Sequence, residues 1–147
     1  MKKYIHLFCI SSILFSAPFA FADGHEESED TPLEEEMSAM NREWRKVRRA
    51  IRDPEKNAET AEIVAKMIKH AKASVDMEPI LLAEQKDKAA KKKFMMGYQK
   101  AMQQTVDMLG ELKAALEAGD NAKANELVGK LNDARKKGHE AYKPEDD

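Results

Sequence analysis

The sequence predicts an all-α protein, folded as an antiparallel up-down-up-down four-helix bundle. Apolar residues recur at helical spacing in four separate segments, and short connections rich in proline, glycine, asparagine or aspartate divide these segments. No stretch alternates apolar and polar residues as a half-buried strand would. Short connections favour antiparallel neighbours, and the 147 residues of the chain are enough for one such domain.

The first 22 residues have the three parts of a secretory signal peptide. Lys2 and Lys3 make a basic start, residues 4–19 are mostly apolar, and Ala20-Phe21-Ala22 has the small-x-small pattern that signal peptidase cleaves. An uncleaved membrane anchor is the alternative, but the apolar run is shorter than the roughly 20 residues that span a bilayer. We therefore expect export to the periplasm, with no membrane contact after cleavage.

Cleavage also decides which chemistry the mature chain can use. It removes Cys9, the only cysteine, so we expect no disulfide, no thiolate metal site and no cofactor attached through cysteine. Loss of Lys2 and Lys3 from 25 basic residues leaves 23 against 27 acidic ones, a net charge of −4. This mildly acidic balance argues against nucleic-acid binding, which needs a dominant basic surface.

Residues 23–31 contain five carboxylates and no apolar residue, so we expect an acidic disordered tail. The first helix begins after it. Thr31 is a good N-cap, Pro32 suits the first helical position, and Glu34 completes a capping box. Steps of 4 and 3 residues then predict one buried face, formed by Leu33, Met37, Met40, Trp44, Val47 and Ile51.

The second helix is expected from about residue 58 to 77. Pro54 disfavours helical geometry before it, Asn57 can cap it, and Pro79 ends it. The apolar segment 80–82 is expected to fold against the end of the bundle. The predicted inward residues of the helix are Val64, Met67, Ile68, Ala71 and Val75.

The third helix is expected over about 87–118, with a lysine-rich start that frays or bends. Gly119 can end it in a C-cap, and Asp120 or Asn121 starts the fourth helix, which Pro144 closes. The domain is thus predicted over 32–143, followed by a short tail at 144–147. The inward residues of these two helices are Phe94, Tyr98, Met102, Leu109, Leu112, Leu116, Ala124, Leu127, Val128, Leu131, Ala134 or Arg135, Gly138 and Tyr142.

In this topology, the start of the first helix and the end of the last lie side by side. Met37 and His139 each lie about one turn from those ends, so they occupy matching depths. A thioether and an imidazole that face each other there form a His/Met pair of the kind that binds haem iron. Arg135, one turn from His139, could bind a haem propionate or a carboxylate of the first helix. A flat group against Gly138 would account for a glycine in a helix interior, where it costs roughly 1 kcal/mol.

Each of these residues also has an ordinary interpretation. A methionine at a heptad position is usually packing material in a core. A histidine near the end of a helix is usually a surface residue that the helix dipole favours. A single arginine there is most often a solvated charge. Spacing by itself therefore leaves the haem site a hypothesis.

Longer motifs add a resemblance. The chain has Thr31-Pro32-Leu33-Glu34-Glu35-Glu36-Met37 at the first helix and Leu131-x3-Arg135-x3-His139-x2-Tyr142 at the last, with Lys66-Met67, Phe94-x-x-Gly97-Tyr98 and Gly119 between them. In order and spacing these motifs resemble the cytochrome b562 family over about 33–143. That family consists of small periplasmic four-helix bundles that hold one b-type haem non-covalently between a methionine and a histidine.

The resemblance implies the roles of particular residues. Met37 and His139 would be the axial ligands of the haem iron, and Arg135 would lie near the haem edge. Tyr98 or Phe94, together with Met67, would line the pocket. With both axial positions taken, the expected function is one-electron transfer by a periplasmic carrier that is not an enzyme.

We expect the carrier to be a monomer whose redox partners are other proteins. An acidic partner could dock on the lysine cluster at 88–93, which is otherwise a solvated face. No nucleophile has a neighbouring base, and His70 shows no partner in the sequence, so it is interpreted as a surface or boundary residue.

Two other functions stay open. If cleavage follows Ala22, His25 becomes the third residue of the mature chain, where its imidazole and the free amino terminus can bind Cu(II) in a square plane. A periplasmic copper-binding protein is therefore one alternative. A haem-free helical bundle that acts through protein interactions is the other.

Overall fold

The computed structural model describes residues 30–144 as four helices without a strand. They are α1 (Pro32–Ala50), α2 (Asn57–Ser74), α3 (Lys88–Glu117) and α4 (Asn121–Tyr142). This confirms the all-α four-helix bundle. The signal peptide, His25, nearly all of the acidic tail and residues 145–147 lie outside the described residues.

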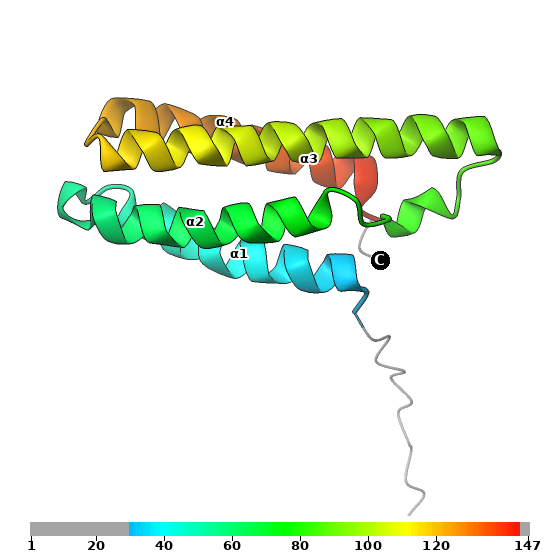
Figure 1. Cartoon of the computed structure of the whole chain (residues 1–147), viewed down its shortest axis with the longest axis horizontal. Coiled ribbons are helices and arrows are strands. Elements are labelled where there is room, and N and C mark those ends of the chain that lie inside the picture. The colour runs from blue at the N-terminus through cyan, green and yellow to red at the C-terminus, as the bar shows by residue number, and fades with distance from the viewer. Residues whose placement is uncertain (1–29, 145–147) are drawn as a thin grey trace, which may run out of the picture.

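Successive helices run in alternate directions (Figure 1). The start of α1 and the end of α4 consequently lie at the same end of the bundle, where α2 also ends and α3 begins. Within residues 30–144, no helix is both long enough and apolar enough to cross a bilayer.

Local signals in the sequence account for the helix ends. The Glu34 amide donates to the Thr31 hydroxyl at 3.3 Å, and the Thr31 amide donates to the Glu34 carboxylate at 2.7 Å, so the predicted capping box is present. Asp120 caps α4 by accepting a hydrogen bond from the Lys123 amide at 2.9 Å. Gly119 has φ +70°, a left-handed conformation that glycine adopts without strain.

The end of α2 differs from the prediction, because the helix stops at Ser74 and not near residue 77. The Ser74 carbonyl accepts a hydrogen bond from the Met77 amide at 3.2 Å, as in a turn, and a second one from the Tyr98 hydroxyl of α3 at 2.8 Å. The following apolar segment forms the short 3-10 turn η2 (Ile80–Leu82). Only part of it covers the bundle as expected, since Leu82 is buried and Ile80 is 44% exposed.

His70 has a partner that its sequence context did not reveal. Its Nδ1 lies 2.6 Å from a carboxylate oxygen of Glu36, across the seam between α1 and α2. His70 is partly exposed, so its interpretation as a surface or boundary residue is confirmed, and the partner is an addition to it. Glu36 and His70 are 34 positions apart in the chain, and only the packing of the two helices brings them together.

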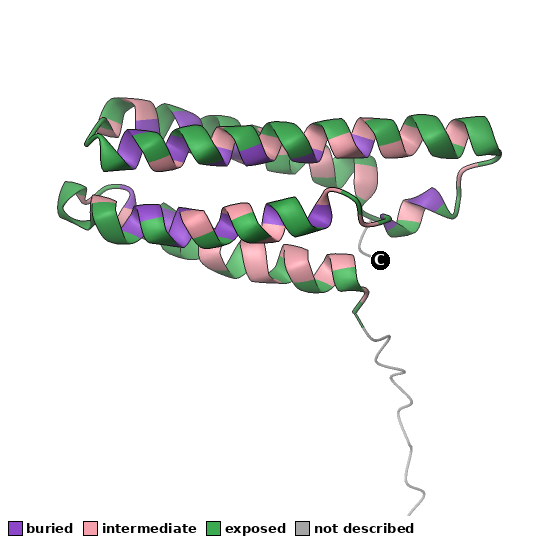
Figure 2. Ribbon diagram, in the orientation of Figure 1, coloured by how far each residue is buried: buried purple, intermediate pink, exposed green. Residues whose placement is uncertain are grey.

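The core fills one half of the bundle more completely than the other (Figure 2). Leu109 and Leu112 of α3 are fully buried, and so is Val47 of α1. The prediction of a continuous buried face on α1 is wrong for its first three apolar residues, which are only partly buried: Leu33, Met37 and Met40. The physical reason is an open seam beside them.

Candidate functional site

A cavity of about 670 Å³ opens between α1, α3 and α4 at the end of the bundle where α1 begins. α1 packs closely along α2, α2 along α3 and α3 along α4, whereas α1 and α4 have no comparable contact. The fourth seam of the bundle is therefore the one left open. Its partly apolar walls include Leu33, Met37, Met40, Tyr98, Met102, Met108, Leu131, Ala134, Gly138 and Tyr142.

Met37 and His139 both line this cavity, Met37 from α1 and His139 from α4. Tyr98 and Arg135 line it as well. The structure thus brings four of the six residues singled out in the sequence to one site. Which of them bind a ligand stays a prediction.

The other two candidates lie beside the cavity. Met67 lines a second, smaller cavity of about 60 Å³, whose walls include Met37 and Arg135. Phe94 lines neither cavity and packs edge-on against Tyr142, with ring centroids 5.2 Å apart and an interplanar angle of 76°. Phe94 therefore reaches the site through Tyr142.

Tyr142 forms an aromatic wall that sequence reasoning did not single out as a site element. It contacts Phe94 on one side and Tyr98 on the other, with the Tyr98 and Tyr142 centroids 5.4 Å apart. A Cβ atom at Gly97 would lie 2.9 Å from the Tyr142 hydroxyl, so the glycine leaves room for this ring. The sequence did contain signals for two lining residues that were not singled out: Tyr142 belongs to the motif at the end of the last helix, and Met40 belongs to the apolar stripe of the first. Neither signal could show whether the side chain lines a cavity or packs in the core.

Gly138 faces open space. A Cβ atom built on it would meet no heavy atom of the described residues within 4 Å, and the residue lines the cavity. The glycine is therefore not required by contacts within these residues. The prediction that a flat group lies against it remains a prediction, for which the space is present.

Tyr98 anchors this end of α3 to α2. Its side chain is 3% exposed, and its hydroxyl donates the 2.8 Å hydrogen bond to the Ser74 carbonyl. Burial raises the pKa of the Tyr98 hydroxyl from 10.0 to about 12, because the phenolate would lose its hydration.

This tyrosine is expected to make stability decrease at high pH. The Tyr98 side chain loses its proton near pH 10.0 in the unfolded chain and near pH 12 in the folded one. Its contribution to the free energy of unfolding is therefore complete below pH 10 and is lost between pH 10 and pH 12. At about 1.4 kcal/mol per pKa unit, the loss is roughly 2–3 kcal/mol. Urea unfolding of wild type and Tyr98→Phe as a function of pH measures it, since other groups titrate in both proteins. An identical pH dependence of the two would contradict the burial argument.

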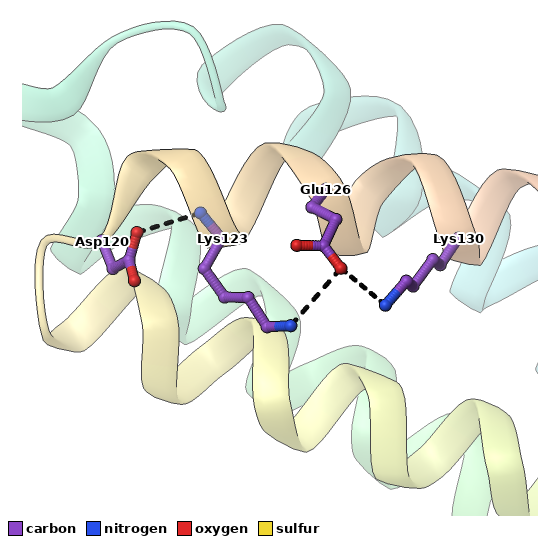
Figure 3. A network of polar contacts seen from close by, with 4 residues as sticks. All are labelled: Asp120, Lys123, Glu126 and Lys130. Atoms are coloured by element: carbon purple, nitrogen blue, oxygen red, sulfur yellow. Dashed lines mark hydrogen bonds and ion pairs between the residues drawn. The ribbon is translucent and has the colours of Figure 1, made fainter.

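Basic side chains of α4 lie around the cavity, with Asp133 as the acidic side chain among its lining residues. Figure 3 shows how one of them, Lys130, is held along the helix by Glu126 at 2.6 Å, while Lys123 approaches the same carboxylate at 3.4 Å. The hydrogen bond and charge of Lys130, together with Lys123, keep the pKa of Glu126 below its usual range.

Arg135 contrasts with Lys130. No carboxylate among residues 30–144 forms an ion pair with its guanidinium, so the alternative of a carboxylate on α1 is not realised within these residues. An unpaired guanidinium at a cavity suits a ligand that carries a carboxylate.

Within residues 30–144, no group of three or more His, Cys, Asp or Glu side chains could hold a metal ion. The cavity instead offers a thioether and an imidazole from different helices. Its volume is in the range of about 300–1,000 Å³ typical of small-molecule sites. Apolar walls, these two donors and the guanidinium together fit a b-type haem.

Comparison with known families agrees with this fit. The family model for cytochrome b562 matches residues 32–143, which include all four helices and every residue that lines the cavity. Neither the curated proteins nor the solved structures contain a significant match to the chain. Because the family match covers the whole bundle, the chain belongs to the cytochrome b562 family of haem-binding electron-transfer proteins.

Proposed function

We propose that this protein is a periplasmic one-electron carrier that binds one b-type haem, with Met37 and His139 as the axial ligands. The observation that carries the proposal is that these two side chains line one cavity although they are 102 positions apart. When bound, the haem supplies the one-electron chemistry of its iron.

The residues of the chain have separate tasks in this proposal. The Met37 thioether and the His139 imidazole would both bind the haem iron and would leave no position on it for a substrate, in keeping with a family whose members are in general not enzymes. A thioether ligand also favours a higher reduction potential than a second imidazole would.

The walls of the cavity would keep water away from the haem. Leu33 and Met40 line the cavity from α1, and the rings of Tyr98 and Tyr142 line it from α3 and α4. Arg135 would bind a carboxylate of the haem, because no carboxylate of the described residues forms an ion pair with its guanidinium. Met67 and Phe94 support these walls from behind.

The periplasmic location is supported by two observations. Residues 1–22 have the pattern of a secretory signal, and the family is typically periplasmic. Mass spectrometry of the amino terminus of protein from the periplasmic fraction tests the location. A chain that still begins at Met1, or one found only in the cytoplasm, would contradict it.

Titration of the purified mature chain with haem tests the main proposal. We expect one equivalent to produce a six-coordinate low-spin spectrum and to quench Trp44, the only tryptophan, which lines the smaller second cavity together with Met37. Binding should raise the free energy of unfolding by about 2.7 kcal/mol when free haem exceeds the dissociation constant 100-fold. If the spectrum stays that of free haem and stability is unchanged, the protein is a haem-free bundle.

A further inference from the structure

Five of the six arginines of the chain lie within eleven residues, from Arg42 to Arg52. They stand on the second half of α1 and in the turn that follows it, whereas lysine is the predominant cation elsewhere. All five are exposed: Arg42, Arg45, Arg48, Arg49 and Arg52. We call this set the arginine face.

The helical positions place these charges on the outer side of α1. Steps of three residues separate the members of the arginine face, except for the adjacent Arg48 and Arg49, and this spacing puts all five on one side of a helix. Trp44 and Val47, the buried residues of this half of α1, occupy the opposite side. The face therefore points away from the bundle core.

The charges of the arginine face are not balanced within residues 30–144. The only carboxylate between positions 42 and 52 is Glu43, and it binds Lys46 at 2.8 Å. No arginine of the face has an ion pair or a hydrogen bond through its side chain to another described residue. A net excess of positive charge results, in a chain whose formal net charge is −2.

Helix stability does not explain the arrangement. The dipole favours cations in the last turn, which accounts for Arg48 and Arg49 but not for Arg42 and Arg45. Like charges three or four positions apart also repel each other and disfavour the helix. A locally unfavourable pattern of this kind is expected where a surface serves binding.

Arginine is the cation best suited to phosphate, because its planar guanidinium can donate two parallel hydrogen bonds to one group. The arginine face would extend over about 15 Å of helix at 1.5 Å per residue. It contains no exposed large apolar residue, since the two of the described chain, Ile80 and Met96, lie elsewhere. Protein interfaces usually have an apolar centre, whereas electrostatic attachment to a lipid surface needs none.

We propose that the arginine face binds the phosphate groups of anionic phospholipids and holds the protein at a membrane surface. This is peripheral contact, without insertion, and it replaces the expectation that the mature chain does not touch the membrane. The face lies on the second half of α1, and the cavity with Met37 lies at its first half, so the attachment uses a different part of the helix from the proposed haem site.

Co-sedimentation of the mature chain with vesicles tests the proposal. One set of vesicles contains phosphatidylglycerol and phosphatidylcholine in equal parts, and the other contains phosphatidylcholine only. Wild type should sediment with the anionic vesicles at low salt, not with the zwitterionic ones, and high salt should release it because counterions screen surface charges.

A matched pair of triple variants separates the arginine face from net charge. Arg45→Gln, Arg48→Gln and Arg49→Gln should weaken binding roughly 100-fold, because each cation at a lipid surface contributes about a fivefold factor. Lys91→Gln, Lys92→Gln and Lys93→Gln remove the same charge from exposed positions at the start of α3 and should cost no more than about fivefold.

Three outcomes would overturn the proposal. Wild type does not bind anionic vesicles, or binds both vesicle types alike, or the two triple variants lose equal affinity. Capture of wild type by polyglutamate, but not by anionic vesicles, would identify an acidic polypeptide as the partner instead. Circular dichroism checks that both variants are helical, and the haem spectrum is measured separately, so failure here leaves the haem proposal intact.

Discussion

Replacement of His139 by alanine is expected to abolish the six-coordinate low-spin spectrum of the haem-loaded protein. Met37→Ala should also remove that spectrum, because one axial position then loses its donor. Loss of an outer partner of a metal ligand costs about 10–100-fold in affinity, so loss of a ligand itself should cost more than about 100-fold. Visible absorption during haem titration of each variant measures both effects.

Two other side chains provide matched controls. Met40 lies nearly one turn from Met37 on the same helix and lines the same cavity, and His70 is the other histidine among residues 30–144. Met40→Ala and His70→Ala should keep the six-coordinate spectrum. If Met40→Ala loses it and Met37→Ala keeps it, the ligand on α1 has been assigned to the wrong methionine.

Leu112→Ala is expected to have the largest effect on stability, a loss of about 3 kcal/mol in the free energy of unfolding. The Leu112 side chain is fully buried in the closed half of the bundle, where neighbouring helices cannot relax into the vacated volume. Urea unfolding of the haem-free protein gives the value. When haem is then added to Leu112→Ala, the folded fraction of this variant should still show the six-coordinate spectrum.

Comparison with Met37→Ala makes this result informative about function. Met37 is only partly buried beside the open seam, so its truncation should cost about 1 kcal/mol or less. Ligation and stability should thus respond to different residues. A loss of stability in Met37→Ala as large as that in Leu112→Ala would mean that the missing spectrum reflects unfolding.

Local chemistry made much of the fold predictable. Thr31 and Glu34 satisfy each other's backbone amides within one turn, and Gly119 provides the left-handed residue that ends α3. Such signals depend on neighbours in the chain and need no knowledge of the packing. The end of α2 was less predictable, because one of the two donors to the Ser74 carbonyl, the Tyr98 hydroxyl, comes from another helix.

The sequence by itself determined the four helices, the apolar stripe of each one, and that the start of α1 and the end of α4 lie at the same end of the bundle. It therefore brought Met37 and His139 to the same end of the bundle. Only the tertiary structure decided that the seam between α1 and α4 stays open, that Tyr142 forms a wall of the cavity there and that Glu36 reaches His70. The physical reason is that periodicity specifies the direction of a side chain from its own helix, whereas the distance between two helices depends on how all their side chains pack.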